Sequence, residues 1–328
     1  MKQTVVCFGE VLIDFHAQAP SEPGVPPTFV AHAGGAPANA AVAIARLGGK
    51  ASFIGMLGCD MFADMLLAQL RASGVAVDHV ARTDAANTAL AFVSHDAHGE
   101  RSFSFYRPPA ADLLFREADY SPAAFADAAV FHACSNSLTE APIAAATLDG
   151  MTRARAAGAL VSFDMNLRPA LWARDEDPTP RVWQALALAD LVKLSAEELT
   201  FLSAGMSSEQ AVIERLWQCR ASLLVVTDGA GAVRWFTSNR EGRLLAFRVD
   251  AVDTTAAGDA FTGGLLRGLV TAGVDADGLS VLAEDGAQRD ALLRFAAACG
   301  ALAVTRTGSF AAMPTLAAVN SFLELHHE

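Results

Sequence analysis

The stretch "DTTAAGDAFTGG", Asp253–Gly264, places a single carboxylate, Asp259, directly after a run of very small residues. The apolar positions of "DAFTGGLLRGLV" recur with helical spacing, so a helix is expected to begin beside Asp259. The N–H groups of a helix start bind anions, and the small side chains of Ala256, Ala257 and Gly258 let an anion approach the backbone. Asp259, ionised next to the helix dipole, could accept a proton. An anion hole beside a base suits phosphoryl transfer to a hydroxyl, although an ordinary alanine-rich helix start fits the same residues.

A second run of small residues, "AHAGGAPANAAVAIARLGG", also precedes a helix. Gly34 and Gly35 would let a ligand approach closely, and Asn39 in the first turn could hydrogen-bond to hydroxyl groups. Pro37 near the first helical position equally fits a plain helix N-terminus, so both interpretations stay open.

Further polar residues follow expected strands, where parallel sheets bind their ligands. They are Asp14; Asp164, Asn166 and Arg168 in "FDMNLRPALW"; and Lys193, Ser195 and Glu198 in "VKLSAEEL". Each alone could be a helix cap or a surface ion pair, but their joint placement predicts a site.

Two familiar nucleotide-binding loops are not found. No GxxxxGK[ST] sequence occurs. Gly229–Arg234 imitates the start of a dinucleotide fingerprint, but Arg234 replaces the third glycine and the following residues are typical of a strand. A nicotinamide-dependent dehydrogenase is therefore disfavoured.

The elements that must position these residues alternate between strands and helices. Apolar runs predict strands over Val5–Phe8, Ser52–Leu57, Ala129–His132, Ala159–Asp164, Leu191–Leu194 and Leu223–Thr227. Helical spacing predicts helices over Ala36–Leu47, Phe62–Ser73, Pro142–Ala157, Arg181–Ala189 and Ser208–Gln218. This order indicates an α/β fold, a doubly wound and mostly parallel sheet with helices on both faces. We expect one domain over residues 1–328.

Two segments interrupt this order. Val11–Ala33 is proline-rich and expected to be irregular, whereas Thr88–Arg107 alternates polar and apolar residues around a turn at His98–Gly99. Together, residues 11–33 and 88–108 predict a small inserted β-sheet that forms a lid. A second hairpin is expected from Gly231–Phe236 and Leu244–Val249, and a strand is expected to lead into the small residues before Asp259.

Composition limits the partners. The net charge of −12 disfavours nucleic acid and anionic membrane surfaces, so an anionic ligand would need local positive groups. No apolar run reaches the roughly 18 residues of a membrane span, and no signal pattern is evident, so a cytoplasmic protein is expected. The five cysteines are expected to be buried small apolar residues.

Two long segments carry a family resemblance. "GGAPANAAVAIARLGGKASFIGMLGCDMFADML" and "DTTAAGDAFTGGLL" resemble the signature regions of the ribokinase-like (PfkB) carbohydrate kinases. "GEVLIDF", "FHACSNSL" and "VTDGAGAV", with the motifs quoted above, occur in the order typical of the family's fructokinases. The resemblance covers nearly the whole chain.

The resemblance implies a role for each candidate residue. Asp259 would be the catalytic base, and Ala256, Ala257 and Gly258 would form the anion hole. The sugar would be held by Asp14, Gly34, Gly35, Asn39, Asp164, Asn166 and Arg168, with Tyr106 and Arg107 covering it from the lid. The nucleotide would be bordered by Lys193, Thr227, Gly229, Gly231, Cys299 and Gly300.

The resemblance also implies metal ions. The family's Asn-x-x-Glu element, which is tied to hydrated Mg²⁺, appears here as Ser195-x-x-Glu198. Carbonyl groups near Asp253, Thr255, Ala303, Arg306 and Gly308 could bind K⁺.

The activity implied is that of an ATP-dependent fructokinase, with Mg²⁺ as cofactor. A 2-keto-3-deoxygluconate kinase is the alternative enzyme, and a non-catalytic sugar or nucleotide sensor is the alternative of another class. A homodimer formed through the lid is also expected, because the edges of an inserted sheet can pair.

Overall fold

The structure is a computed structural model that describes residues 2–18, 26–95, 101–107 and 109–326. The turn expected at His98–Gly99 lies outside the described residues.

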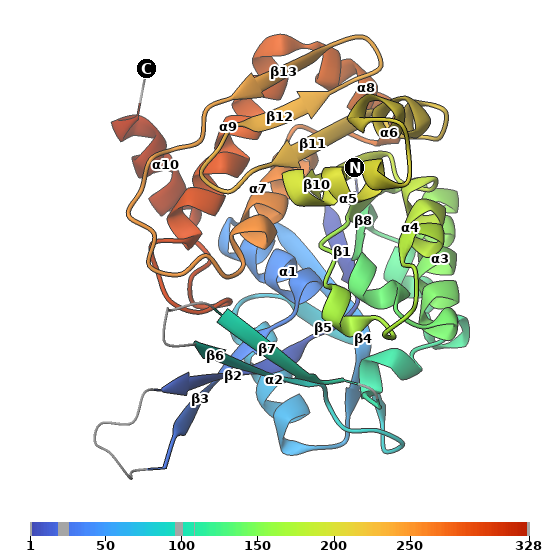
Figure 1. Cartoon of the computed structure of the whole chain (residues 1–328), viewed down its shortest axis with the longest axis vertical. Helices are drawn as coiled ribbons and strands as arrows, with labels where there is room; N and C mark the ends of the chain where they lie inside the picture. Colours follow the sequence, from blue (N-terminus) through green and yellow to red (C-terminus); the bar gives the residue numbers. More distant parts are fainter. Residues whose placement is uncertain (1, 19–25, 96–100, 108, 327–328) are drawn as a thin grey trace.

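The large sheet is doubly wound, as the sequence predicts (Figure 1). Its nine strands lie in the order β13-β12-β11-β10-β9-β8-β1-β4-β5. Seven strands are parallel, namely β1 (Thr4–Phe8), β4 (Lys50–Gly58), β5 (Ala76–Thr83), β8 (Ala128–Cys134), β9 (Leu160–Asp164), β10 (Leu191–Ser195) and β11 (Leu223–Thr227). The antiparallel strands β12 (Val233–Phe236) and β13 (Glu241–Leu244) complete one edge.

Helices cover both faces of this sheet, which explains its nearly continuous apolar strands. One apolar cluster joins the sheet to α1 (Ala36–Arg46), α2 (Met61–Ala72), α7 (Ala257–Thr271), α8 (Ala276–Glu284) and α9 (Gly286–Ala303). A second cluster joins the other face to α3 (Ala141–Ala156), α4 (Thr179–Leu186), α5 (Ala196–Ala204) and α6 (Glu209–Trp217). The last helix, α10 (Leu316–Leu325), packs against α9.

Neighbouring strands β1 and β8 mark the point where the winding reverses. The chain leaves β1 toward β4 through α1, on one face, and leaves β8 toward β9 through α3, on the other. A crevice forms at the carboxyl ends of two strands that diverge in this way. The topology therefore places a cavity after Phe8 and after Cys134.

Glycines bring three helices close together beside this crevice. A Cβ on Gly263 of α7 would lie 2.5 Å from the Cβ of Ala43 on α1, and a Cβ on Gly264 would lie 2.8 Å from the Cys299 sulfur on α9. Only glycine allows such approaches.

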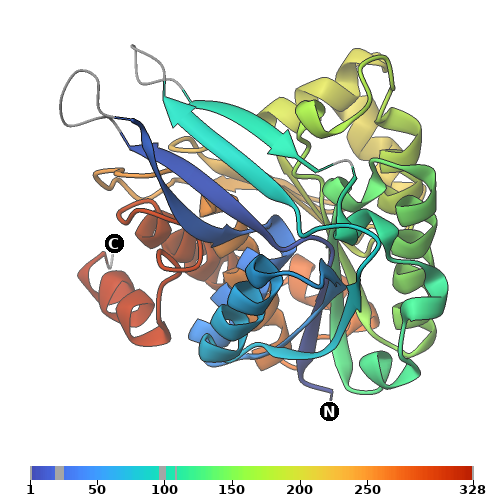
Figure 2. The same cartoon turned by 90° about the horizontal axis from the view of Figure 1, so that it is seen from below.

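The expected inserted sheet is present and has four strands in the order β3-β2-β6-β7. They are β2 (Leu12–Gln18), β3 (Thr28–Gly34), β6 (Leu90–His95) and β7 (Arg101–Tyr106). Figure 2 shows this sheet projecting to one side of the large sheet. The irregular conformation expected for Val11–Ala33 is wrong for the described part of that segment, because β2 and β3 pair with each other from Leu12–Gly34 to Gln18–Thr28.

Two other expectations need correction. The strand expected before Ala256 is not formed, and the second strand of the late hairpin is Glu241–Leu244, not Leu244–Val249. After β13 the chain leaves the sheet edge and runs beside α10, where Phe247 contacts Phe322 with ring centroids 5.0 Å apart (Figure 1). An apolar run without a neighbouring strand cannot satisfy its backbone as a strand.

The cysteines also differ from expectation. Cys7, Cys134 and Cys299 are buried, but Cys59 is exposed and Cys219 is half-buried. Cys59 directly precedes the N-cap residue of α2, at a surface loop. In the described ranges, no helix is long and apolar enough to cross a membrane.

Candidate active site

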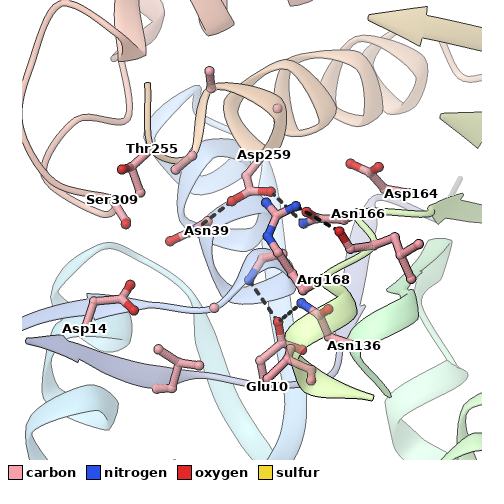
Figure 3. Close-up of a pocket in the computed structure, with 18 of the residues that line it drawn as sticks. Glu10, Asp14, Asn39, Asn136, Asp164, Asn166, Arg168, Thr255, Asp259 and Ser309 are labelled. Atoms are coloured by element: carbon pink, nitrogen blue, oxygen red, sulfur yellow. Dashed lines mark hydrogen bonds between the residues drawn. The ribbon is translucent and has the colours of Figure 1, made fainter. Parts of the chain in front are cut away.

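A cavity of about 580 Å³ opens at the carboxyl ends of β1, β8, β9 and β10, between the large sheet and the small sheet (Figure 3). Most of the predicted sugar and catalytic residues line it. These are Asp14, Gly35, Asn39, Arg107, Asp164, Asn166, Arg168, Ala256, Ala257, Gly258 and Asp259, and they are joined by Lys193 from the predicted nucleotide set and Thr255 from the predicted K⁺ set. Gly34 lies at its margin, since a Cβ there would meet the Asp14 carboxylate at 2.1 Å.

Helix α7 begins at this cavity, as the small-residue run predicted. Its N-cap residue Ala256 has the left-handed backbone angles φ 59° and ψ 13°, and no side chain caps the helix. A left-handed alanine is strained, and such residues persist where the surrounding structure holds them. Ala257 N donates a long hydrogen bond of 3.5 Å to the Thr254 carbonyl oxygen, and no side chain caps the N–H groups that follow it, so a ligand can bind them.

Asp259 is buried in the first turn of α7, between two amides from distant segments. Its Oδ2 accepts a hydrogen bond from Asn39 Nδ2 at 2.8 Å, and its Oδ1 accepts one from Asn166 Nδ2 at 3.4 Å (Figure 3). Asn166 also has a positive φ, 39°. Among the described residues, Asn166 and Ala256 are the two non-glycine residues with positive φ, and both line the cavity.

Burial changes the proton affinity of two carboxyl groups here. It raises the pKa of Asp259 to about 6, with the Asp164 charge adding to the effect and the Asn39 hydrogen bond opposing it. Burial, with the charges of Asp259 and Glu10, raises the pKa of Asp14 to about 7. Asp259 is thus mostly ionised at neutral pH yet able to take a proton.

Lys193 reaches the cavity from β10 and is buried in an ion pair. Its Nζ lies 2.8 Å from Asp164 Oδ2, which also accepts a hydrogen bond from Thr262 at 3.1 Å. The charge of Asp164 keeps the pKa of Lys193 raised despite burial. A Cβ on Gly258 would lie 3.4 Å from the same Nζ, so this cation stands beside the start of α7.

Ser195 and Glu198 form a capping box at the start of α5, outside the cavity. Glu198 Oε2 accepts from Ser195 N at 2.8 Å, its Oε1 accepts from Leu167 N at 2.7 Å, and Ser195 Oγ accepts from Glu198 N at 3.1 Å. These contacts are those of a helix cap. Asp164 fits hydrated Mg²⁺ better, because it lines the cavity and its buried Oδ1 has no partner among the described residues. The metal role of Ser195 and Glu198 stays a prediction.

The lid residues separate onto opposite faces of β7. Phe105 and Arg107 line the cavity, whereas Tyr106 is 65% exposed and packs on Phe92 with ring centroids 5.2 Å apart. Alternate side chains of a strand point to opposite faces, so Tyr106 cannot cover a ligand that Arg107 contacts in this arrangement. The covering role expected for Tyr106 is not supported.

Arg107 is a buried residue of the cavity floor and not an exposed cover. Its Nε donates to Asp112 Oδ2 at 2.8 Å, and one terminal nitrogen donates to the Asn136 carbonyl oxygen at 2.7 Å. Its guanidinium is therefore already engaged by a carboxylate and a backbone oxygen.

The remaining nucleotide candidates are not among the residues that line the cavity. Thr227 ends β11, and Gly229 and Gly231 lie in the loop that follows. A Cβ on Gly300 would lie 3.2 Å from the Ala257 carbonyl oxygen, beside the helix start. The Cys299 thiol is buried against Gly264, so it does not face this space.

The residues proposed for K⁺ form a backbone junction. Asp253 Oδ1 accepts from Thr255 N at 2.8 Å and its Oδ2 accepts from Gly308 N at 3.0 Å, which fixes the loop before α7 to the loop after α9. Ala303 ends α9 and Arg306 follows it. In the part of the chain that the structure describes, no group of three or more His, Cys, Asp or Glu side chains is placed to hold a metal ion.

Comparison with known proteins agrees with this geometry. The model of the pfkB family carbohydrate kinases matches residues 2–316. The chain belongs to this family. A fructokinase with bound ATP from Xylella fastidiosa is 53% identical, with both chains fully covered and a TM-score of 0.96.

Two further fructokinases are also similar. Fructokinase-1 of Oryza sativa subsp. japonica is 43% identical over 326 residues, 98% of each chain. The fructokinase of Vibrio cholerae O395, in its fructose, ADP and calcium ion bound form, is 34% identical with a TM-score of 0.86, covering 98% of this chain and 99% of that one.

The cavity is also lined by residues that were not predicted from the sequence. Glu10, Phe105, Asn136 and Ser309 line it. Glu10 and Asn136 follow the buried strands β1 and β8, so the strand-end rule applied to Asp164 would have found both.

Proposed function

We propose that this chain is an ATP-dependent fructokinase that converts D-fructose and ATP into fructose 6-phosphate and ADP. The observation that carries the proposal is Asp259 at the uncapped start of α7, inside a cavity whose walls offer amide and carboxylate groups to a sugar. The full-length similarity to fructokinases that bind ATP, or fructose with ADP, supports the substrate pair.

Transfer proceeds directly from ATP to the sugar. As the 6-hydroxyl oxygen attacks, its proton passes to the Asp259 carboxylate, the new O–P bond forms, and the bond from the γ-phosphorus to its bridging oxygen breaks. The N–H groups of Ala257 and Gly258 and the Lys193 ammonium stabilise the charge on the transferred group. Asp14, Gly34, Gly35, Asn39, Asn166 and Arg168 position the sugar.

Metal ions complete the proposed site. Asp164 would hold the hydration shell of Mg²⁺ bound with ATP, and the ion would neutralise phosphate charge. K⁺ would lie among carbonyl groups at the Asp253 junction, near Ala303, Arg306 and Gly308, where it would order the loop before α7. The Gly229–Gly231 loop, Thr227 and Gly300 would border the nucleotide.

The test is ADP release with MgATP against fructose, 2-keto-3-deoxygluconate, ribose, adenosine, glucose and no sugar. Turnover that is strongest with fructose supports the proposal. Preference for 2-keto-3-deoxygluconate would assign the alternative substrate to the same site. No turnover with any sugar, with Mg²⁺ and K⁺ present, would favour a sensor.

We also propose a dimer formed through the small sheet and a cytoplasmic location. The outer face of that sheet exposes Phe29 and Tyr106, which contact Phe92 at centroid distances of 5.5 and 5.2 Å. Exposed aromatic groups on a four-stranded sheet with two open edges favour association. Unpaired cysteines, Cys59 among them, suit a reducing compartment.

A further inference from the structure

Two buried polar side chains meet at the point where the large sheet reverses its winding. Glu10 follows β1 and Asn136 follows β8, two strands that are hydrogen-bonded neighbours. Both side chains line the cavity, and their exposed fractions are only 2% and 6%. In Figure 3 this pair lies on the side of the cavity away from Asp259, and Arg168 is drawn between the pair and Asp259.

The pair is only half satisfied by the protein. Glu10 Oε1 accepts from Ala36 N at 3.2 Å and from Asn136 Nδ2 at 3.0 Å. Glu10 Oε2 and Asn136 Oδ1 are buried and have no hydrogen-bond partner among the described residues. Buried polar atoms of a native protein are normally paired, so two adjacent unpaired acceptors in a cavity wall indicate a ligand that donates hydrogen bonds.

Arg107 holds this floor in place without offering a cation to the ligand. Its guanidinium donates to the Asn136 carbonyl oxygen at 2.7 Å and pairs with Asp112 Oδ2 at 2.7 Å. The Asn136 backbone is therefore fixed, and the positive charge is matched by a buried carboxylate. Fixed acceptors cost little reorganisation when a ligand binds.

We infer that Glu10 and Asn136 are specificity-determining residues that accept hydrogen bonds from hydroxyl groups of the sugar, at the end away from the transferred phosphoryl group. Two sugar hydroxyls can donate one hydrogen bond each to Glu10 Oε2 and Asn136 Oδ1, whereas an ionised carboxylate at the same place has no proton to donate. Glu10 and Asn136 therefore select a neutral polyol over a sugar acid. The inference rests on the proposed sugar kinase function and gives it a physical basis for substrate class.

The test is Glu10→Gln. The Gln side chain has the same shape and can keep its oxygen toward Ala36 N and Asn136 Nδ2, so its amide nitrogen replaces Oε2 and turns an acceptor into a donor. The KM for fructose should rise roughly 10-fold to 100-fold, as expected when a buried acceptor is replaced by a donor that faces the donating hydroxyl. The KM for ATP and kcat should change less than about twofold, and the ratio of kcat/KM for 2-keto-3-deoxygluconate to that for fructose should rise.

The matched control is Glu140→Gln. Glu140 is exposed at the start of α3, its side chain caps no backbone group, and its charge acts on Arg107 as that of Glu10 does. The Glu140→Gln variant loses a negative charge near Arg107 but keeps the cavity unchanged, so its kcat and KM values should equal those of the wild type.

An unchanged KM for fructose in Glu10→Gln, or equal increases for fructose and ATP, would overturn the inference. If Glu10→Gln does not fold, Asn136→Ser removes the second acceptor and should raise the KM for fructose selectively. If the wild-type chain does not phosphorylate fructose, the proposed function fails. The increase in melting temperature that fructose causes, compared between wild-type and variant protein, then tests separately whether Glu10 and Asn136 bind the sugar. Equal increases would contradict the inference.

Discussion

The Asp259 carboxyl group is buried, yet it must carry charge to accept a proton. Asn39 and Asn166 donate to its two oxygens and make this possible. Replacement of Asp259 by Asn keeps an oxygen that can accept from Asn39 but removes the base.

For Asp259→Asn we expect kcat to fall about 10²-fold to 10⁴-fold, the usual contribution of a positioned base. The dissociation constant for fructose, measured by calorimetry, should change less than about threefold, because the sugar contacts remain. Asp64→Asn, at an exposed position, is the control. Wild-type turnover in Asp259→Asn would exclude Asp259 as the base.

The raised pKa of Asp259, about 6, predicts an acid limb in the pH profile. Since the ionised form is the base, kcat/KM should be constant above this pH and fall about tenfold per unit below it. Asp14 has a pKa of about 7, so the profile of Asp14→Asn separates the two groups. A limb near pH 6 that disappears in Asp14→Asn would assign it to Asp14.

The same pKa makes a prediction about stability. Folded Asp259 binds a proton more tightly than the unfolded chain, so between about pH 4 and 6 the native state holds more protons and its free energy of unfolding falls as pH rises. Above pH 6 this loss of unfolding free energy is complete, and it amounts to at most about 3 kcal/mol. Asp259→Asn should therefore be more stable than wild type at pH 7 but not at pH 4, in urea titrations.

At the scale of elements, the Arg107–Asp112 pair attaches the end of β7 to the 3₁₀ turn η1 (Ala111–Leu114) and to the residues after β8. Both side chains are almost fully buried. The lid strand is thus anchored at the cavity floor.

Asp112→Ala should destabilise the protein by about 3–5 kcal/mol, because Arg107 would remain buried without its partner. Asp64→Ala removes the half-exposed pair with Arg82 and should cost less than about 1 kcal/mol. Guanidinium denaturation of both variants measures the difference. Equal losses of unfolding free energy in the two variants would show that the buried pair stabilises the protein no more than the exposed pair does.

At the scale of the whole molecule, the outer face of the small sheet predicts self-association. The double variant Phe29→Ser with Tyr106→Ser should sediment as a monomer at concentrations where the wild type is a dimer. Leu245→Ser changes an exposed apolar residue away from this sheet and should leave the dimer intact. A monomeric wild type, or a dimer in both variants, would contradict the lid interface.

The residues of each segment by themselves determined the type of sheet, the helix start at Asp259 and the edge of the sheet where the cavity lies. Apolar strands alternating with helices required a covered parallel sheet, and small residues before Asp259 required a helix start open to a ligand. Polar residues at strand ends predicted the cavity, because parallel strands end at one edge of their sheet. These features follow from periodicity and side-chain size, which each segment carries by itself.

Only the tertiary structure decided which side chains share the cavity. The alternation along β7 put Phe105 inside and Tyr106 outside, and a shift of one residue would reverse them. The reversal of winding between β1 and β8 brought Glu10 to Asn136, 126 residues apart in the chain. The segment after β13 does not form its expected strand, because no strand in the described part of the chain pairs with it. Such outcomes depend on pairing and packing between distant segments, which no single segment encodes.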